Sequence, residues 1–182
     1  MMKHIFLTLA TLALLNFSAC VEGEQKQEVE VKTPEEVKEE TEETPDRFDA
    51  EFKDGMVGKV FQNYLEVRTS LVNSDLEDAK TAASNLAQAF EEERAEMKAA
   101  ALAMAEAEGL DDLRTHFSEF TTLVEPLLKE SVSSGTIYKQ YCPMAFDNEG
   151  AYWFSDAEEI RNPYFGDEML TCGNVEETIT KK

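Results

Sequence analysis

The chain has 182 residues, 30% of which are charged, and its formal net charge is −21 at pH 7. Binding to nucleic acid is excluded as its main activity, because contacts with phosphate require clustered Lys and Arg side chains. Without the N-terminal leader described next, the length is that of one domain.

Residues 1–19 have the layout of a cleavable secretory signal. Lys3 gives a positive start, residues 5–15 form an apolar run (IFLTLATLALL), and Ser18-Ala19-Cys20 gives a small-residue cleavage site. The apolar run has about 11 residues, whereas a helix that spans a membrane needs about 20. We therefore predict a signal peptide and not a permanent membrane span.

The residues around Cys20 predict a lipid anchor. Ser18-Ala19-Cys20 resembles the lipobox that the lipoprotein signal peptidase recognises, although Phe17 stands where that pattern prefers Leu, Val or Ile. The alternative is cleavage without lipidation, which Phe17 fits less well because a small residue is wanted there. We expect an exported protein whose Cys20 carries the lipid. The lipid would anchor the protein to a membrane of the cell envelope, facing the periplasm or the outside.

Residues 20–49 are expected to form a stalk between this anchor and the domain. Within them, the stretch EVEVKTPEEVKEETEETPD has no aromatic residue and no apolar periodicity. Such a composition buries too little apolar surface to offset the entropy lost on ordering. We predict a disordered acidic stalk that holds the domain away from the membrane.

The globular domain is predicted at residues 50–182, and its first part is helical. Apolar residues recur at steps of three and four over residues 52–72, 79–104 and 113–128. The middle pattern leaves open whether residues 75–108 form one long helix or two, with a break near residues 91–93. Short connections predict an antiparallel three- or four-helix bundle.

The expected helix ends follow from a few residues. Ser74 and Glu77 have the spacing of a capping box that opens the second helix, and Gly109 is expected to cap its end. The next helix is predicted at residues 111–132, where Pro126 should produce a kink.

Residues 135–179 are expected to form a small C-terminal β-hairpin and loop cap. Residues 136–141 are rich in β-branched and aromatic side chains and predict a strand, residues 147–150 a turn, and residues 151–154 a return strand. A hairpin this small must pack on the bundle to be stable. The predicted fold is therefore mainly α, with a small β cap.

Soft metal ligands gather in this cap. Cys142 and Met144 are two positions apart, so on a strand both side chains point the same way. Thiolates and thioethers suit Cu(I), and imidazole suits copper and zinc. A ring such as that of Trp153 can cover a monovalent cation. The candidate metal ligands are Cys142, Met144, Met169, Cys172 and His116, with Trp153 as a cation–π cap.

A disulfide between Cys142 and Cys172 is the alternative. Lipidation consumes Cys20, and two remaining cysteines in an exported protein commonly pair. Closing this loop of about thirty residues would add roughly 3–4 kcal/mol of stability. In that case the aromatic residues Tyr152, Trp153, Tyr164 and Phe165 would form a surface that docks a partner protein.

Motifs of common enzyme classes are absent from the chain. There is no G-x-S-x-G, H-E-x-x-H, Gly-rich phosphate loop or C-x-x-C redox pair. We predict a protein that is not an enzyme.

Four C-terminal motifs resemble a domain family of unknown function. They are YCPMAF at 141–146, GAYW at 150–153, IRNPYFGD at 160–167 and MLTCG at 169–173. Members of that family occur as small exported lipoproteins and fused to periplasmic adaptor subunits of copper/silver-type heavy-metal efflux pumps. The resemblance implies binding or handover of a soft heavy metal, with Cu(I) as the expected ion. It also implies an efflux adaptor or another envelope protein as partner. The alternative function is a non-catalytic structural or interaction module.

Overall fold

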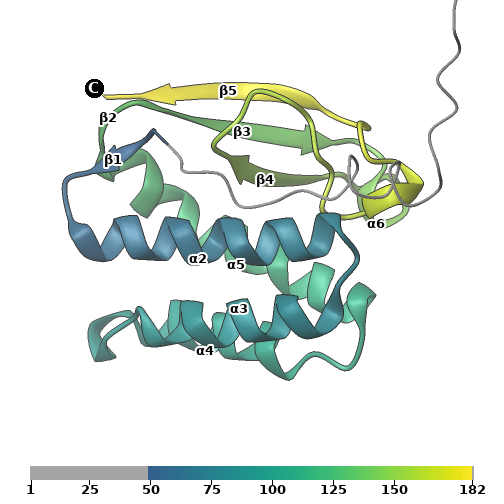
Figure 1. Cartoon of the computed structure of the whole chain (residues 1–182), viewed down its shortest axis with the longest axis horizontal. Helices are drawn as coiled ribbons and strands as arrows, with labels where there is room; N and C mark the ends of the chain where they lie inside the picture. Colours follow the sequence, from purple (N-terminus) through teal and green to yellow (C-terminus); the bar gives the residue numbers. More distant parts are fainter. Residues whose placement is uncertain (1–48, 182) are drawn as a thin grey trace, which may run out of the picture. The chain divides into compact units, whose positions relative to one another are not determined.

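A computed structural model describes residues 49–181 of the protein (Figure 1). The predicted signal peptide, Cys20 and nearly all of the predicted stalk lie outside these residues. The mainly helical prediction is confirmed for the described part, which contains five α-helices and small antiparallel sheets. None of the helices described is long and apolar enough to cross a membrane.

Four long helices make up the first part of the domain. They are α2 (Gly55–Val72), α3 (Leu76–Gln88), α4 (Ala95–Glu106) and α5 (Leu110–Ser131). Helix α2 packs against α3 and α5, and α4 packs against α3 and α5. The short 3-10 helix η1 (Glu92–Arg94) lies between α3 and α4, so the second apolar pattern forms two helices. Figure 1 shows α2 and α5 between the strands and the α3/α4 pair.

Two of the predicted helix ends are wrong. The Asp75 side chain caps α3 by accepting the N–H of Asp78 at 3.0 Å, whereas the predicted cap Ser74 has a left-handed backbone with φ of 56°. Gly109 does not end α4, whose C-cap is Ala107. Instead, Gly109 has an extended backbone and is the N-cap of α5. A helix start needs an extended N-cap, which Gly109 provides without a side chain.

A three-stranded antiparallel sheet follows the helices, with β3 in its centre. The strand order is β4 (Ala151–Ser155), β3 (Thr136–Cys142), β5 (Asn174–Thr180). A second pair joins β1 (Glu51–Phe52) to β2 (Val132–Ser134). The predicted strands at 136–141 and 151–154 are present and pair with each other. Strands β1, β2 and β5 were not predicted.

The connection from β3 to β4 has an unusual backbone. It contains α6 (Ala145–Asn148), in which Phe146, Asp147 and Asn148 have positive φ values of 51°, 56° and 73°. Residues other than Gly, Asn and Asp seldom adopt this left-handed conformation, so Phe146 is the most unfavourable of the three. The turn predicted at residues 147–150 thus starts at Phe146.

Tyr64 joins the helices to the sheet at the centre of the core. Its side chain has no exposed area, and its ring lies 5.0 Å from Phe117 and 6.2 Å from Phe120, measured between centroids. The Tyr64 hydroxyl lies 2.9 Å from Thr121 Oγ1 on α5 and accepts the N–H of Phe154 on β4 at 3.0 Å. Burial raises the pKa of Tyr64 well above its ordinary value. One side chain therefore fixes β4 against α2 and α5.

Candidate functional site

Cys142 and Cys172 lie side by side at one end of the sheet. Their Sγ atoms are 3.7 Å apart and form a thiol hydrogen bond, although the residues are 30 positions apart in the chain. Cys142 is the last residue of β3 and has no exposed area, whereas Cys172 lies before β5 and is half-buried. Pairing of Tyr141 with Asn174 between β3 and β5 brings the two cysteines together.

Gly173 permits this close approach. Its φ is +148°, and a Cβ atom placed there would stand 2.7 Å from the Tyr141 carbonyl oxygen and 2.9 Å from Trp153 Cη2. Neither the backbone oxygen nor the buried ring can move away easily. Residue 173 must therefore be glycine for Cys172 to reach the end of β3.

Asn162 holds the segment that carries Cys172. This residue has no exposed area, and its Nδ2 donates to the Cys172 carbonyl at 2.7 Å. Its backbone N–H donates to the Leu170 carbonyl at 2.8 Å, while its Oδ1 accepts the N–H of Tyr164 at 2.8 Å. In the structure, the Asn162 side chain positions Cys172 through its hydrogen bond to the Cys172 carbonyl. In the sequence, Asn162 is part of the IRNPYFGD motif, which gives no indication of this role.

Gln140 holds the start of the same loop. Its side chain is fully buried, and its Nε2 donates to the carbonyls of three successive residues, 157, 158 and 159, at 2.9, 3.1 and 3.2 Å. Gln140 pairs with Trp153 across β3 and β4. A buried amide that satisfies three carbonyls fixes the loop, since leaving them unpaired would be costly.

Met144 and Met169 line a different part of the site. Both border an open cavity of about 520 Å³, together with residues of the β3–β4 connection, the Tyr164–Phe165 segment and the start of α5. The prediction that Met144 shares a face with Cys142 is wrong. Strand β3 ends at Cys142, and Met144 has helical backbone and is 46% exposed while Cys142 is buried.

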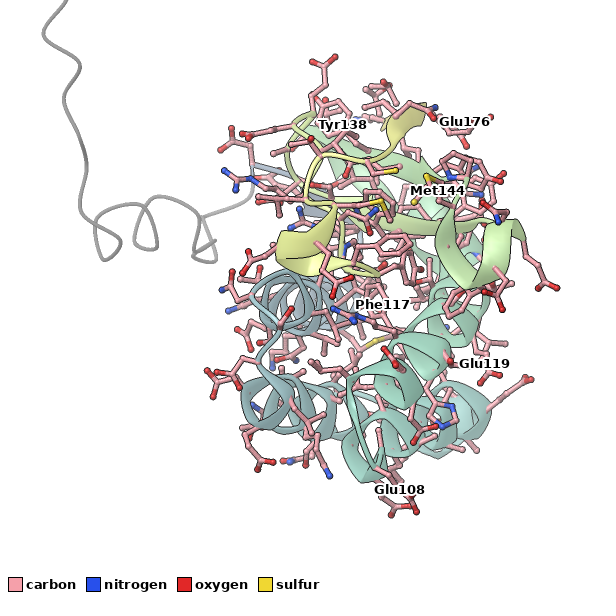
Figure 2. All side chains as sticks on the ribbon, turned by 90° about the vertical axis from the view of Figure 1, so that its right-hand side faces the viewer. Glu108, Phe117, Glu119, Tyr138, Met144 and Glu176 are labelled. Atoms are coloured by element: carbon pink, nitrogen blue, oxygen red, sulfur yellow. The ribbon has the colours of Figure 1, made fainter. Side chains whose placement is uncertain are left out.

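His116 lies apart from the sulfur-containing residues. Phe117 beside it points into the core (Figure 2), while His116 Nδ1 is 3.2 Å from Glu119 Oε2 and its Nε2 is 3.6 Å from Asp112 Oδ1. His116 borders another cavity, shared with Glu108 and not with Met144. Figure 2 shows Met144 on the sheet side of the molecule and Glu108 at the opposite end. The structure does not bring His116 to the methionines. Within residues 49–181, no three His, Cys, Asp or Glu side chains are grouped to hold a metal ion.

The aromatic residues predicted to dock a partner are largely internal. Trp153 and Tyr164 are buried and pack edge to face, with ring centroids 6.0 Å apart. Tyr152 is 39% exposed, with Lys139 Nζ 4.2 Å from its ring centroid, and Phe165 is half-buried. The four residues therefore do not form one exposed surface. Trp153 is a core residue, which also removes it as an exposed cap over a cation.

The environment favours the protonated form of Cys172. Burial raises the pKa of its thiol, and the hydrogen bond to Cys142 raises it further. A ligand that binds the thiolate must therefore displace a proton at neutral pH.

Comparison with known proteins gives one match. No curated protein and no solved structure matches the chain. A family model described as "Protein of unknown function (DUF3347)" matches residues 60–135, which run from α2 to just before β3. The match ends ahead of Cys142, so the C-terminal motifs and their link to efflux adaptors stay predictions. Residues 60–135 of this chain thus match the model of DUF3347, a domain of unknown function.

Proposed function

We propose that this protein binds a soft monovalent metal ion, Cu(I) in the first place, through Cys142 and Cys172, and hands it over within the cell envelope. The observation that carries the proposal is the 3.7 Å separation of the two Sγ atoms. Thiolates are the ligands that soft ions such as Cu(I) prefer.

The separation of the two sulfurs suits shared coordination of one ion. Two thiolates that bind one ion with tetrahedral geometry at about 2.3 Å, as zinc does, stand about 3.8 Å apart. The observed distance of 3.7 Å is close to this value. When Cu(I) is bound by two thiolates alone, the angle between the bonds is wider, and the sulfurs must move somewhat further apart. A disulfide needs about 2.05 Å. Ion binding therefore requires less movement of the sulfurs than oxidation does.

The surroundings of the pair also support binding. Asn162 and Gly173 hold Cys172 beside Cys142 without an ion, so little of the binding free energy is spent on ordering the chain. Binding converts two thiols and one Cu(I) ion into a dithiolate complex and releases two protons. His116 is not part of this ligand pair, because it borders another cavity.

A titration of the full mature chain with Cu(I) under reducing conditions tests this function. A chromophoric Cu(I) chelator competes for the ion and reports the affinity. We expect one tightly bound equivalent in the wild type, and an affinity at least about 100-fold lower in Cys172→Ser. Ser84→Ala, at a half-buried position on α3, is the control and should bind as the wild type does. Equal affinity in Cys172→Ser and the wild type would rule out the thiol pair.

The cellular setting is the second part of the proposal. We infer that the protein is exported and anchored through a lipid on Cys20, because residues 1–20 have the layout of a lipoprotein signal. Metabolic labelling with a fatty-acid analogue should mark the wild type and leave Cys20→Ser unlabelled. Equal labelling of the two proteins would exclude Cys20 as the lipid carrier.

A structural disulfide is the second candidate, because the same two sulfurs are near enough to form a bond after a local shift. In that case Cys142 and Cys172 staple the end of β3 to the segment before β5, and the protein is an interaction module. Counting the thiols of denatured, unreduced protein separates the two candidates. Two free thiols support the metal site, and none supports the staple.

A further inference from the structure

We propose that Met144 and Met169 form an outer capture site for the same ion, separate from the thiol pair, from which the ion passes inward to Cys142 and Cys172. This inference rests on the proposed function, because it assigns the route by which the ion reaches the thiols. It divides between two sites the sulfur ligands that the sequence suggested for one.

The two thioethers share a place that solvent reaches. Both border the open cavity of about 520 Å³, and Met144 is 46% exposed. Cys142, in contrast, has no exposed area. An ion arriving from solvent therefore meets the thioethers without any change in the protein. Cys142 is covered, and the thiol pair is open to solvent only through the half-buried Cys172.

Each of the two methionines is close in sequence to one of the two cysteines. Met144 follows Cys142 by two residues, across Pro143. Met169 precedes Cys172 by three residues, and the Cys172 N–H donates to the Met169 carbonyl at 3.0 Å in a tight turn. Two of the segments that line the cavity therefore continue directly into the residues that hold the thiols, so the ligands of the outer site are two and three residues from those of the inner site.

Charge at the cavity favours a cation. Asp111 and Asp147 border it, and opposite charge draws cations toward such an opening. Arg114 also borders the cavity, but its guanidinium interacts with Asp111 at 3.4 Å and donates to the Pro163 carbonyl at 3.1 Å. The charges of Arg114 and Asp111 therefore offset each other, and Asp147 supplies the net negative charge among these three side chains.

The type of ligand at each site gives the transfer its direction. A thioether has no proton to lose, so capture of the ion by Met144 and Met169 does not depend on pH. Transfer breaks two bonds from the ion to thioether sulfur and forms two bonds to thiolate sulfur, and the two thiols release two protons to water. The anionic thiolates bind a soft cation more strongly than neutral thioethers do, so the ion moves inward.

Loading kinetics of the full mature chain test the inference. Cu(I) is supplied as its complex with a weak chromophoric chelator under reducing conditions, and its loss from the chelator is followed by stopped flow. For Met144→Leu/Met169→Leu we expect at least about tenfold slower loading and a final affinity within about threefold of wild type. Met97→Leu, a half-buried methionine on α4, is the matched control and should load at the wild-type rate. Wild-type loading by the double variant would overturn the capture site.

Equilibrium binding without the inner thiols gives a second readout. Cys142→Ser/Cys172→Ser should retain one weak Cu(I) equivalent whose affinity is constant from pH 6 to 8, and the added Met144→Leu/Met169→Leu changes should remove it. If the Cys142→Ser variants do not fold, Cys172→Ser alone, at a half-buried position, serves instead. Absence of the weak equivalent would overturn the inference while leaving the proposed function intact. If Cys172→Ser instead binds Cu(I) as tightly as the wild type does, the proposed function itself is wrong.

Discussion

The Sγ atom of Cys142 lies 3.7 Å from the Sγ atom of Cys172, without a bond between them. This contact is made by the pairing of β3 with β5 and by the loop that Gln140 and Asn162 hold. It is the geometric basis of the proposed function, since two soft ligands lie near enough to each other to bind one ion.

Metal affinity should rise steeply with pH. Thiols bind the ion as thiolates and release their protons, and burial together with the hydrogen bond to Cys142 raises the pKa of Cys172. The apparent affinity for Cu(I) is then expected to increase by up to about 100-fold per pH unit between pH 6 and 8, as for two released protons. Chelator competition at three pH values measures the slope. A slope near zero would mean that the thiols are not the ligands.

Asn162→Ala should weaken both the fold and the metal site. The change removes the donor to the Cys172 carbonyl and the acceptor for the Tyr164 N–H, both in a buried setting. We expect a loss of at least about 2 kcal/mol in the free energy of unfolding. A lower Cu(I) affinity should accompany it at temperatures where the variant is folded. Asn85→Ala, at an exposed position on α3, is the control for both measurements. Wild-type affinity in folded Asn162→Ala would show that Asn162 does not position Cys172.

Gln140→Glu should destabilise the protein in a pH-dependent way. The substitution exchanges the Nε2 donor for a carboxylate oxygen that faces three carbonyls. The buried carboxyl would stay protonated in the folded state, so its folded pKa would exceed its unfolded value of about 4.3. The folded state then binds the extra proton, and the deficit in stability grows as pH rises above about 4.3. Urea unfolding at pH 4.5 and 7.5 measures this, with Gln88→Glu, exposed at the end of α3, as control. A deficit that is equal at both pH values would contradict the expectation.

His116→Ala should leave metal binding unchanged. The imidazole contacts Asp112 and Glu119 on its own helix and borders a cavity that excludes the methionines. We expect an affinity for Cu(I) within about threefold of the wild type, because loss of a true ligand would cost much more. A tenfold or larger loss would return His116 to the ligand set.

Patterns of apolar, aromatic and β-branched residues in the sequence predicted the four long helices and two of the strands. The segments in which apolar residues recur every three or four positions form α2, α3, α4 and α5. The runs of aromatic and β-branched residues form β3 and β4. Strand β5 was missed because its inward row is not uniformly apolar. Glu177 occupies that row between Val175 and Ile179, and its carboxylate binds Lys129 Nζ at 2.6 Å on α5. Because this inward-facing residue is charged and pairs with a distant helix, the sequence lacks the alternation of apolar and polar residues that identifies a strand.

The candidate site was predicted in part for similar reasons. Counting cysteines paired Cys142 with Cys172, since only these two remain after Cys20, and their sulfurs are in contact. The place of Met144 depended on where β3 ends, which Pro143 determines by lacking an N–H for the ladder. The place of His116 depended on a single step of about 100° along α5, which separates it from the buried Phe117. Asn162 and Gln140 gave no signal, because their partners are carbonyls of distant loops.

X-ray absorption at the copper edge of the Cu(I)-loaded, reduced protein shows which atoms bind the ion. We expect a first shell of sulfur only, with two sulfurs at bonding distance, and the loss of a sulfur from that shell in Cys172→Ser. A first shell containing nitrogen or oxygen in the wild type, or an unchanged spectrum in Cys172→Ser, would contradict the proposed function.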